Sequence, residues 1–141
     1  MDSEKKILII DDDELMIKIL KFILHKEGYQ LSVAKDGLSA MRQMSLIVPD
    51  MVITDIILPY KSGLEVISFV KNNFEKTAII VLSALGEEEQ SVTEAFKLGA
   101  DDFVSKPFNP KELLLRVKRF LKSESNEKII KRTDRKSTRL N

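Results

Sequence analysis

The 141-residue chain contains no cysteine, and this absence excludes both a disulfide framework and a thiolate metal site. Long apolar runs are absent too: none approaches the ~18 residues that a membrane-spanning helix needs. The N-terminus places charged residues before only four apolar ones, which is unlike a signal peptide. We therefore expect a soluble, cytoplasmic protein.

The chain also lacks a strong excess of charge, since its net charge is only +1. That value hides an asymmetry, because residues 123–141 hold six basic residues against three acidic ones, which leaves residues 1–122 at −2. A mildly acidic main domain has no excess of basic residues of the kind that binds nucleic acid directly or contacts a membrane surface. We expect residues 123–141 to be a polar, basic tail or linker, with a partly non-native end; contact with nucleic acid or an acidic surface is the alternative.

What the sequence does contain is a regular alternation of short apolar runs and amphipathic stretches. With 43% apolar and 32% charged residues, the composition is that of one globular domain. The short runs are typical of buried strands, and the stretches with helical spacing predict helices. The expected strands are Ile7–Ile10, Gln30–Ala34, Met51–Thr54, Ala78–Leu82 and Asp102–Ser105. The expected helices are 14–27, 38–46, 62–73, 87–98 and 110–122.

Five strand–helix units in about 120 residues indicate an α/β fold, because parallel strands need crossover connections. We expect a five-stranded parallel sheet in the flavodoxin-like, doubly wound order 2-1-3-4-5, with helices on both faces. In this order the first and third strands are neighbours, and the chain reverses direction between them. Ligands bind at that point, outside the carboxyl ends of the strands.

Polar residues follow the strands at this same edge. Asp11 and Asp12 come directly after the first strand, and Asp55 ends the third. Ser83 ends the fourth strand and Lys106 the fifth. Charged carboxylates at buried strand ends are costly to the core, but they suit a hard cation. A carboxylate nucleophile, a cation, a hydroxyl and an ammonium together meet the needs of phosphoryl transfer.

These motifs, in this order, resemble the response-regulator receiver domain of two-component signalling over about residues 5–122, so we expect a receiver domain at residues 1–122. The match includes Thr-Asp-Ile-Ile-Leu-Pro around Asp55, Gly63 at the start of the next helix, Ser83-Ala84 and Lys106-Pro107. The resemblance implies that Asp55 takes a phosphoryl group from a histidine kinase, a phosphotransfer protein or a small phosphodonor. It also implies Mg²⁺ as the cofactor, bound by Asp11, Asp12, Asp55 and the backbone carbonyl of Ile57.

Further roles follow from the same resemblance. Lys106 would pair with Asp55 and then with the phosphoryl group, and its bond to Pro107 would be cis. Ser83 and Phe103 would form the switch that reshapes the face made by helix 87–98, strand 102–105 and helix 110–122. A partner, an output domain or a phosphorylation-dependent dimer would recognise that face. Phe103 could equally be an ordinary core residue.

The positions that flank the phosphoryl site depart from the commonest pattern. Ile57 and Leu85 stand where many relatives carry polar residues. Apolar side chains there cannot orient an attacking water, so we expect slow self-dephosphorylation, with a lifetime nearer hours than seconds. Asp13, the third acid in the row, is interpreted as the cap of the first helix rather than a ligand.

Two other functions compete with the phosphorylated switch. A phosphatase of the haloacid dehalogenase kind needs a second aspartate two residues after the nucleophile, and Ile57 occupies that position. We therefore expect no enzyme activity apart from self-phosphorylation and self-dephosphorylation. A receiver-like binding module that is never phosphorylated usually loses an acid or the lysine, whereas this chain keeps them all. The sequence names neither the kinase nor the output.

Overall fold

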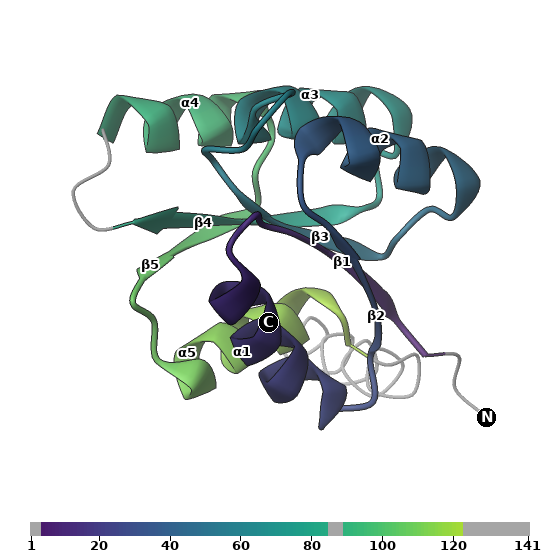
Figure 1. Ribbon diagram of the computed structural model, residues 1–141, viewed down its shortest axis with the longest axis vertical. Coiled ribbons are helices and arrows are strands. Elements are labelled where there is room, and N and C mark those ends of the chain that lie inside the picture. The colour runs from purple at the N-terminus through teal and green to yellow at the C-terminus, as the bar shows by residue number, and fades with distance from the viewer. Residues whose placement is uncertain (1–3, 85–88, 123–141) are drawn as a thin grey trace, which may run out of the picture.

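The computed structural model describes residues 4–84 and 89–122, which form one parallel sheet between two layers of helices (Figure 1). The strands are β1 (Lys6–Ile10), β2 (Gln30–Ala34), β3 (Met51–Asp55), β4 (Ala78–Ala84) and β5 (Asp102–Lys106). The helices are α1 (Glu14–His25), α2 (Gly37–Leu46), α3 (Gly63–Asn73), α4 (Glu89–Leu98) and α5 (Pro110–Phe120). The predicted elements are all present: β2 has its predicted ends, other ends differ by at most two residues, and the predicted start of α4 at residue 87 lies outside the described residues.

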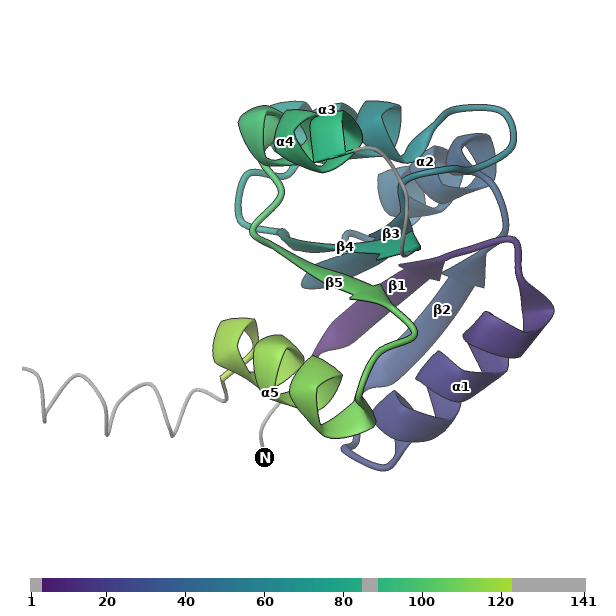
Figure 2. The same cartoon turned by 90° about the vertical axis from the view of Figure 1, so that its left-hand side faces the viewer.

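The sheet has the order β2-β1-β3-β4-β5, with every pair parallel, so the predicted flavodoxin-like topology is confirmed. Helices α2, α3 and α4 cover one face, and α1 and α5 cover the other, as the two views show (Figure 2). β1 lies between β2 and β3 because the chain reverses direction after its second strand. The carboxyl ends of β1 and β3 are therefore adjacent.

Two apolar layers, one on each face of the sheet, hold this arrangement together. Leu8 and Ile10 pack toward α2 and α3, while Ile7 and Ile9 pack toward α1 and α5. All four side chains are essentially buried, and each such burial contributes roughly 1.5–3 kcal/mol to stability. A strand buried on both faces is apolar at every residue, and this is why Ile7–Ile10 predicts a central strand.

The helix starts follow local rules that the sequence already contains. The Asp13 carboxylate accepts hydrogen bonds from the backbone N–H groups of Leu15 and Met16, so its predicted role as the α1 cap is confirmed. Ser62 and Glu65 form a capping box at the start of α3, a pattern of serine and, three residues later, glutamate that is visible in the sequence. Within residues 4–84 and 89–122, no helix is both long and apolar enough to span a membrane. The tail at 123–141 lies outside the described residues.

Candidate functional site

Three carboxylates meet at the carboxyl edge of the sheet, where β1 and β3 lie side by side. One carboxylate oxygen from each of Asp11, Asp12 and Asp55 lies within 4.8 Å of the other two. Asp11 and Asp55 are buried, whereas Asp12 is exposed. The pairing of Ile10 with Thr54 produces this meeting, because the next residue on each strand is an aspartate. Like charges held this close need a cation to balance them.

Lys106 supplies one such charge from the end of β5. Its Nζ lies 2.9 Å from Oδ2 of Asp55 and 3.4 Å from Oδ2 of Asp11. Burial alone would lower the pKa of Lys106, but the hydrogen bond and negative charge of Asp55, and then those of Asp11, raise it above its ordinary value. Lys106 is therefore a fixed cation that bridges the two buried carboxylates. The peptide bond from Lys106 to Pro107 is cis, as the resemblance implies.

One ammonium does not fully compensate the acidic cluster. Burial raises the pKa of Asp11 above its ordinary value, and the charge of Asp55 adds to the increase. The N–H of Asp13, which donates to Asp11 Oδ1 at 2.9 Å, and the charge of Lys106 act in the opposite direction but do not cancel it. A divalent cation among these oxygens would stabilise the ionised form of Asp11. Hard carboxylate oxygens are the ligands that Mg²⁺ and Ca²⁺ prefer, so this donor set fits Mg²⁺.

The loop from β3 to α3 holds Asp55 from the other side. The N–H of Ile57 donates to Asp55 Oδ1 at 3.3 Å, and the N–H of Gly63 donates to the Ile56 carbonyl at 2.8 Å. Asp55 thus has one oxygen directed to the Ile57 amide and the other to Lys106. Ile57, whose N–H contacts Asp55, is 66% exposed. The role of the Ile57 carbonyl as a metal ligand stays a prediction.

The two predicted switch residues lie on neighbouring strands. Ser83 is buried near the end of β4 and is paired in register with Ser105 of β5. Phe103 is half-buried on β5 and meets the ring of Phe96 in α4 edge-on, with ring centroids 6.2 Å apart. Phe103 therefore belongs to the contact between β5 and α4. Leu85, predicted to flank the phosphoryl site, lies outside the described residues, as do Glu87 and Glu88 at the predicted helix start.

One residue of this region has no counterpart among the predicted site residues. Gly37, at the start of α2, lies against the β3–α3 loop: its N–H donates to the Pro59 carbonyl at 3.4 Å. A Cβ atom at Gly37 would lie 2.0 Å from the carbonyl oxygen of Lys61. Asp36 is the N-cap of α2, and in the sequence only the glycine directly after it points to this close contact. The loop that carries Ile57 is thus held between α2 and β3.

The sheet order, the acidic cluster and the bridging lysine define the class of protein: a flavodoxin-like α/β domain with an acidic site, suited to a divalent cation, at the carboxyl edge of its sheet. A sequence model described as the response regulator receiver domain matches residues 7–118. The chain therefore belongs to the response regulator receiver domain family, which confirms the resemblance. Domains of this family are signalling switches that generally bind Mg²⁺ in an acidic cluster of this kind.

Individual relatives support the same assignment. The chain is 36% identical over 118 residues to the alkaline phosphatase synthesis transcriptional regulatory protein PhoP of Bacillus subtilis; this match covers 84% of the chain but only 49% of that relative. A putative response regulator from Chloroflexus aurantiacus is similar with a TM-score of 0.78 and 32% identity, covering 84% of this chain and 98% of that one. The receiver domain of a signal transduction histidine kinase from Syntrophus aciditrophicus gives a TM-score of 0.76 and 33% identity, covering 83% and 89%.

Proposed function

We propose that residues 1–122 are a receiver domain in which Asp55 accepts a phosphoryl group from a histidine kinase, a phosphotransfer protein or a small donor such as acetyl phosphate. The observation that carries this proposal is the 2.9 Å contact between Lys106 and Asp55 beside the acids Asp11 and Asp12. An aspartate that only stabilised the fold would not need two further carboxylates at its side. Residues 123–141 then form a tail or linker.

The proposed reaction is an in-line attack by a carboxylate oxygen of Asp55 on phosphorus. The new O–P bond forms as the donor's P–N or P–O bond breaks, and the imidazole or acetate leaves with the electron pair. Lys106 keeps its proton throughout and moves its contact from the Asp55 carboxylate to a phosphoryl oxygen. Mg²⁺, bound by Asp11, Asp12, Asp55 and the Ile57 carbonyl, would supply charge neutralisation for the transferred group. The Ser83 hydroxyl donates a hydrogen bond to another phosphoryl oxygen.

Phosphorylation would then change the face formed by α4, β5 and α5. Ser83 lies on β4 and Phe103 on its neighbour β5, so an inward shift of Ser83 leaves room for the Phe103 ring to follow it. The contact of Phe103 with Phe96 gives that movement a direct effect on α4. A partner protein, an output domain or a second copy would recognise the altered face. The contact carries the change from the site to the surface.

Incubation with acetyl phosphate and Mg²⁺ tests the acceptor role. Intact-mass analysis is expected to show one added phosphoryl group on the wild-type chain, none on Asp55→Asn, and none when a chelator removes the metal. Asp50→Asn is the matched control, because Asp50 lies at the opposite end of β3 and its carboxylate accepts from the Lys6 amide. A phosphoryl group on Asp55→Asn would contradict the assignment. An unmodified wild-type chain that also fails to bind beryllium fluoride would favour the unphosphorylated binding module.

The lifetime of the phosphorylated form is expected to be nearer hours than seconds. Ile57 is exposed and its backbone contacts Asp55, and its apolar side chain cannot orient a water for attack on the phosphoryl group. The measurement follows the decay of the phosphorylated mass after the donor is removed, with Mg²⁺ present. Ile57→Asn is expected to shorten the lifetime, because an amide can position water. Decay of the wild type within seconds would contradict this prediction.

A further inference from the structure

The outer edge of β2 presents unpaired backbone groups. The Gln30 N–H donates to the Lys5 carbonyl at 2.9 Å, and the Ala34 carbonyl accepts from the Asp11 N–H at 3.1 Å. Because backbone groups alternate in direction along a strand, Leu31 and Val33 face away from β1. Within residues 4–84 and 89–122, the Leu31 N–H, the Leu31 carbonyl and the Val33 N–H have no hydrogen-bond partner, since none is found in the parallel ladder or outside it.

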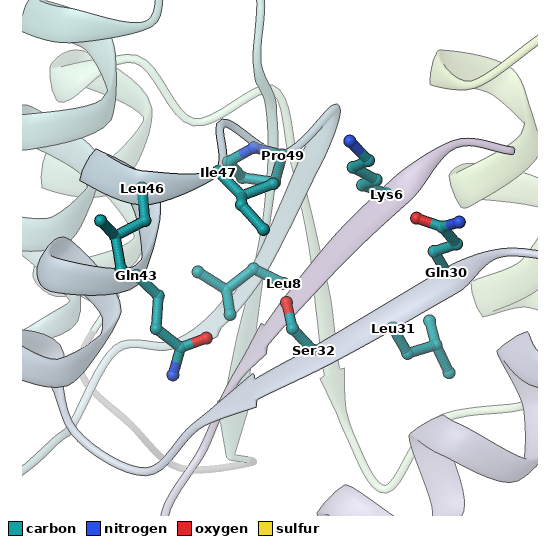
Figure 3. A pocket seen from close by; sticks show the side chains of 9 residues that line it. All are labelled: Lys6, Leu8, Gln30, Leu31, Ser32, Gln43, Leu46, Ile47 and Pro49. Carbon is teal, nitrogen blue, oxygen red and sulfur yellow. The ribbon is translucent and has the colours of Figure 1, made fainter. Parts of the chain in front are cut away.

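A pocket of about 310 Å³ lies beside this edge, between the amino-terminal halves of β1 and β2 and the end of α2. Figure 3 shows the side chain of Leu8 directed toward the end of α2, where Leu46 and Ile47 lie. On β2, the residues that face α2 are the exposed, polar Gln30 and Ser32, which do not fill the layer. The pocket therefore opens toward the free edge of the strand.

The rim of the pocket is apolar and exposed. Of the lining residues, Leu46 is 85% exposed and Ile47 is 62% exposed, and the next residue along the chain, Val48, is 50% exposed. A partner that covers these side chains removes their apolar surface from water, which favours binding. Lys6 also lines the pocket, and within the described part of the chain its ammonium has no ion-pair partner.

We propose that the outer edge of β2 and the pocket below α2 bind an extended peptide segment of a partner protein. The segment adds a short strand beside β2, places a large apolar side chain in the pocket and brings a carboxylate to Lys6. Main-chain hydrogen bonds and pockets for alternate side chains are the two components of this kind of recognition. The surface lies at the opposite end of the sheet from Asp55, so the interaction does not depend on phosphorylation chemistry.

The pattern of unpaired groups favours a partner peptide over a second copy of the chain. In the two-fold antiparallel register that sets Leu31 of one copy opposite Val33 of the other, the Leu31 N–H would need the Val33 carbonyl. That carbonyl already accepts from Nε2 of Gln43 at 2.9 Å. Gln43 therefore competes for the carbonyl that this register of self-pairing uses, but it leaves the Leu31 groups and the Val33 N–H available. A short peptide needs only these three groups.

A display library of random linear peptides, selected on the full chain, tests the proposal. We expect the selected peptides to carry large apolar residues at alternate positions with an acidic residue nearby. Their affinity is expected to fall at least about tenfold, roughly 1.4 kcal/mol, for the double variant Leu46→Asp, Ile47→Asp. Lys6→Glu should weaken the peptides that carry the acid. Leu46 and Ile47 are both exposed, so the double variant should still fold. The midpoint of its unfolding in urea checks this.

Leu115→Asp is the matched control, because Leu115 is 69% exposed on α5, on the other face of the sheet. Amide hydrogen exchange gives an independent readout: a bound peptide should slow exchange at Leu31 and Val33, whereas the amides of Gln30 and Ser32 are already protected by β1. Selected peptides that bind the double variant as well as the wild type would overturn the proposal. So would protection at other sites only, or self-association that the double variant abolishes, which would make a second copy the occupant.

Discussion

The Lys106→Met variant is expected to lose about 10²–10³-fold in its rate of phosphorylation by acetyl phosphate, as when one preorganised stabilising group is removed from an active site. The ammonium lies 2.9 Å from Asp55 Oδ2, so it is already placed where charge develops on the transferred group. Methionine keeps much of the side-chain volume but not the charge. The measurement is the initial rate of phosphorylation at saturating Mg²⁺.

Mg²⁺ binding separates this explanation from a simple loss of structure. Without Lys106, the acids Asp11 and Asp55 lose the cation that bridges them, so the metal-free variant should be less stable than the wild type. Mg²⁺ should still bind, at least as tightly as before, because a competing positive charge is gone. Added Mg²⁺ should therefore raise the urea midpoint of the variant more than that of the wild type.

Lys61→Met is the matched control for the loss of a lysine. Lys61 lies in the β3–α3 loop close to the site, but its partner is Glu65 of α3, at 3.5 Å, and both side chains are about half exposed. Such surface pairs contribute at most about 1 kcal/mol, so rate and Mg²⁺ affinity should stay near the wild-type values. An unchanged rate in Lys106→Met, or a loss of Mg²⁺ binding, would contradict the assigned role.

The meeting of Asp11, Asp55 and Lys106 could be predicted from the sequence because it depends on strand order alone. Apolar runs mark the strands, and the residue after each run lies at the carboxyl edge. The parallel order then decides which edges are neighbours. The caps at Asp13 and Ser62 were equally predictable, since each depends on hydrogen bonds within a few residues.

The close contacts of the β3–α3 loop could not be predicted in the same way. Gly37 lies against the backbone of Lys61, a residue 24 positions away along the chain, and no local pattern reports that distance. The pocket beside β2 likewise depends on how far α2 extends over Gln30 and Ser32. The periodicity of apolar residues predicts on which face of the sheet a side chain lies. It does not predict the volume of the space between that face and the helix that covers it.

Gly63→Ala is expected to be strongly destabilising, although it adds only one methyl group. A Cβ atom at Gly63 would lie 2.2 Å from the carbonyl oxygen of Asp55 and 2.7 Å from the Cα of Ile56. Both are backbone atoms of a buried strand end, so neither can rotate away. We expect a loss of about 3 kcal/mol or more in the free energy of unfolding, at the upper end of overpacking effects.

Gly63→Ala should also slow phosphorylation. This second effect distinguishes a displacement of Asp55 from a loss of global stability. If the Asp55 backbone moves to admit the methyl group, the contact of its carboxylate with Lys106 is lost, and the phosphorylation rate falls even where the variant is fully folded. Ser62→Ala is the matched control: it removes the α3 cap at a cost of about 1 kcal/mol without touching Asp55. Urea unfolding and the phosphorylation rate, measured together at low temperature, check both variants. The prediction would be wrong if Gly63→Ala matched Ser62→Ala in both measurements. The β3–α3 loop would then be able to shift and admit the methyl group, and its close packing would not be what positions Asp55.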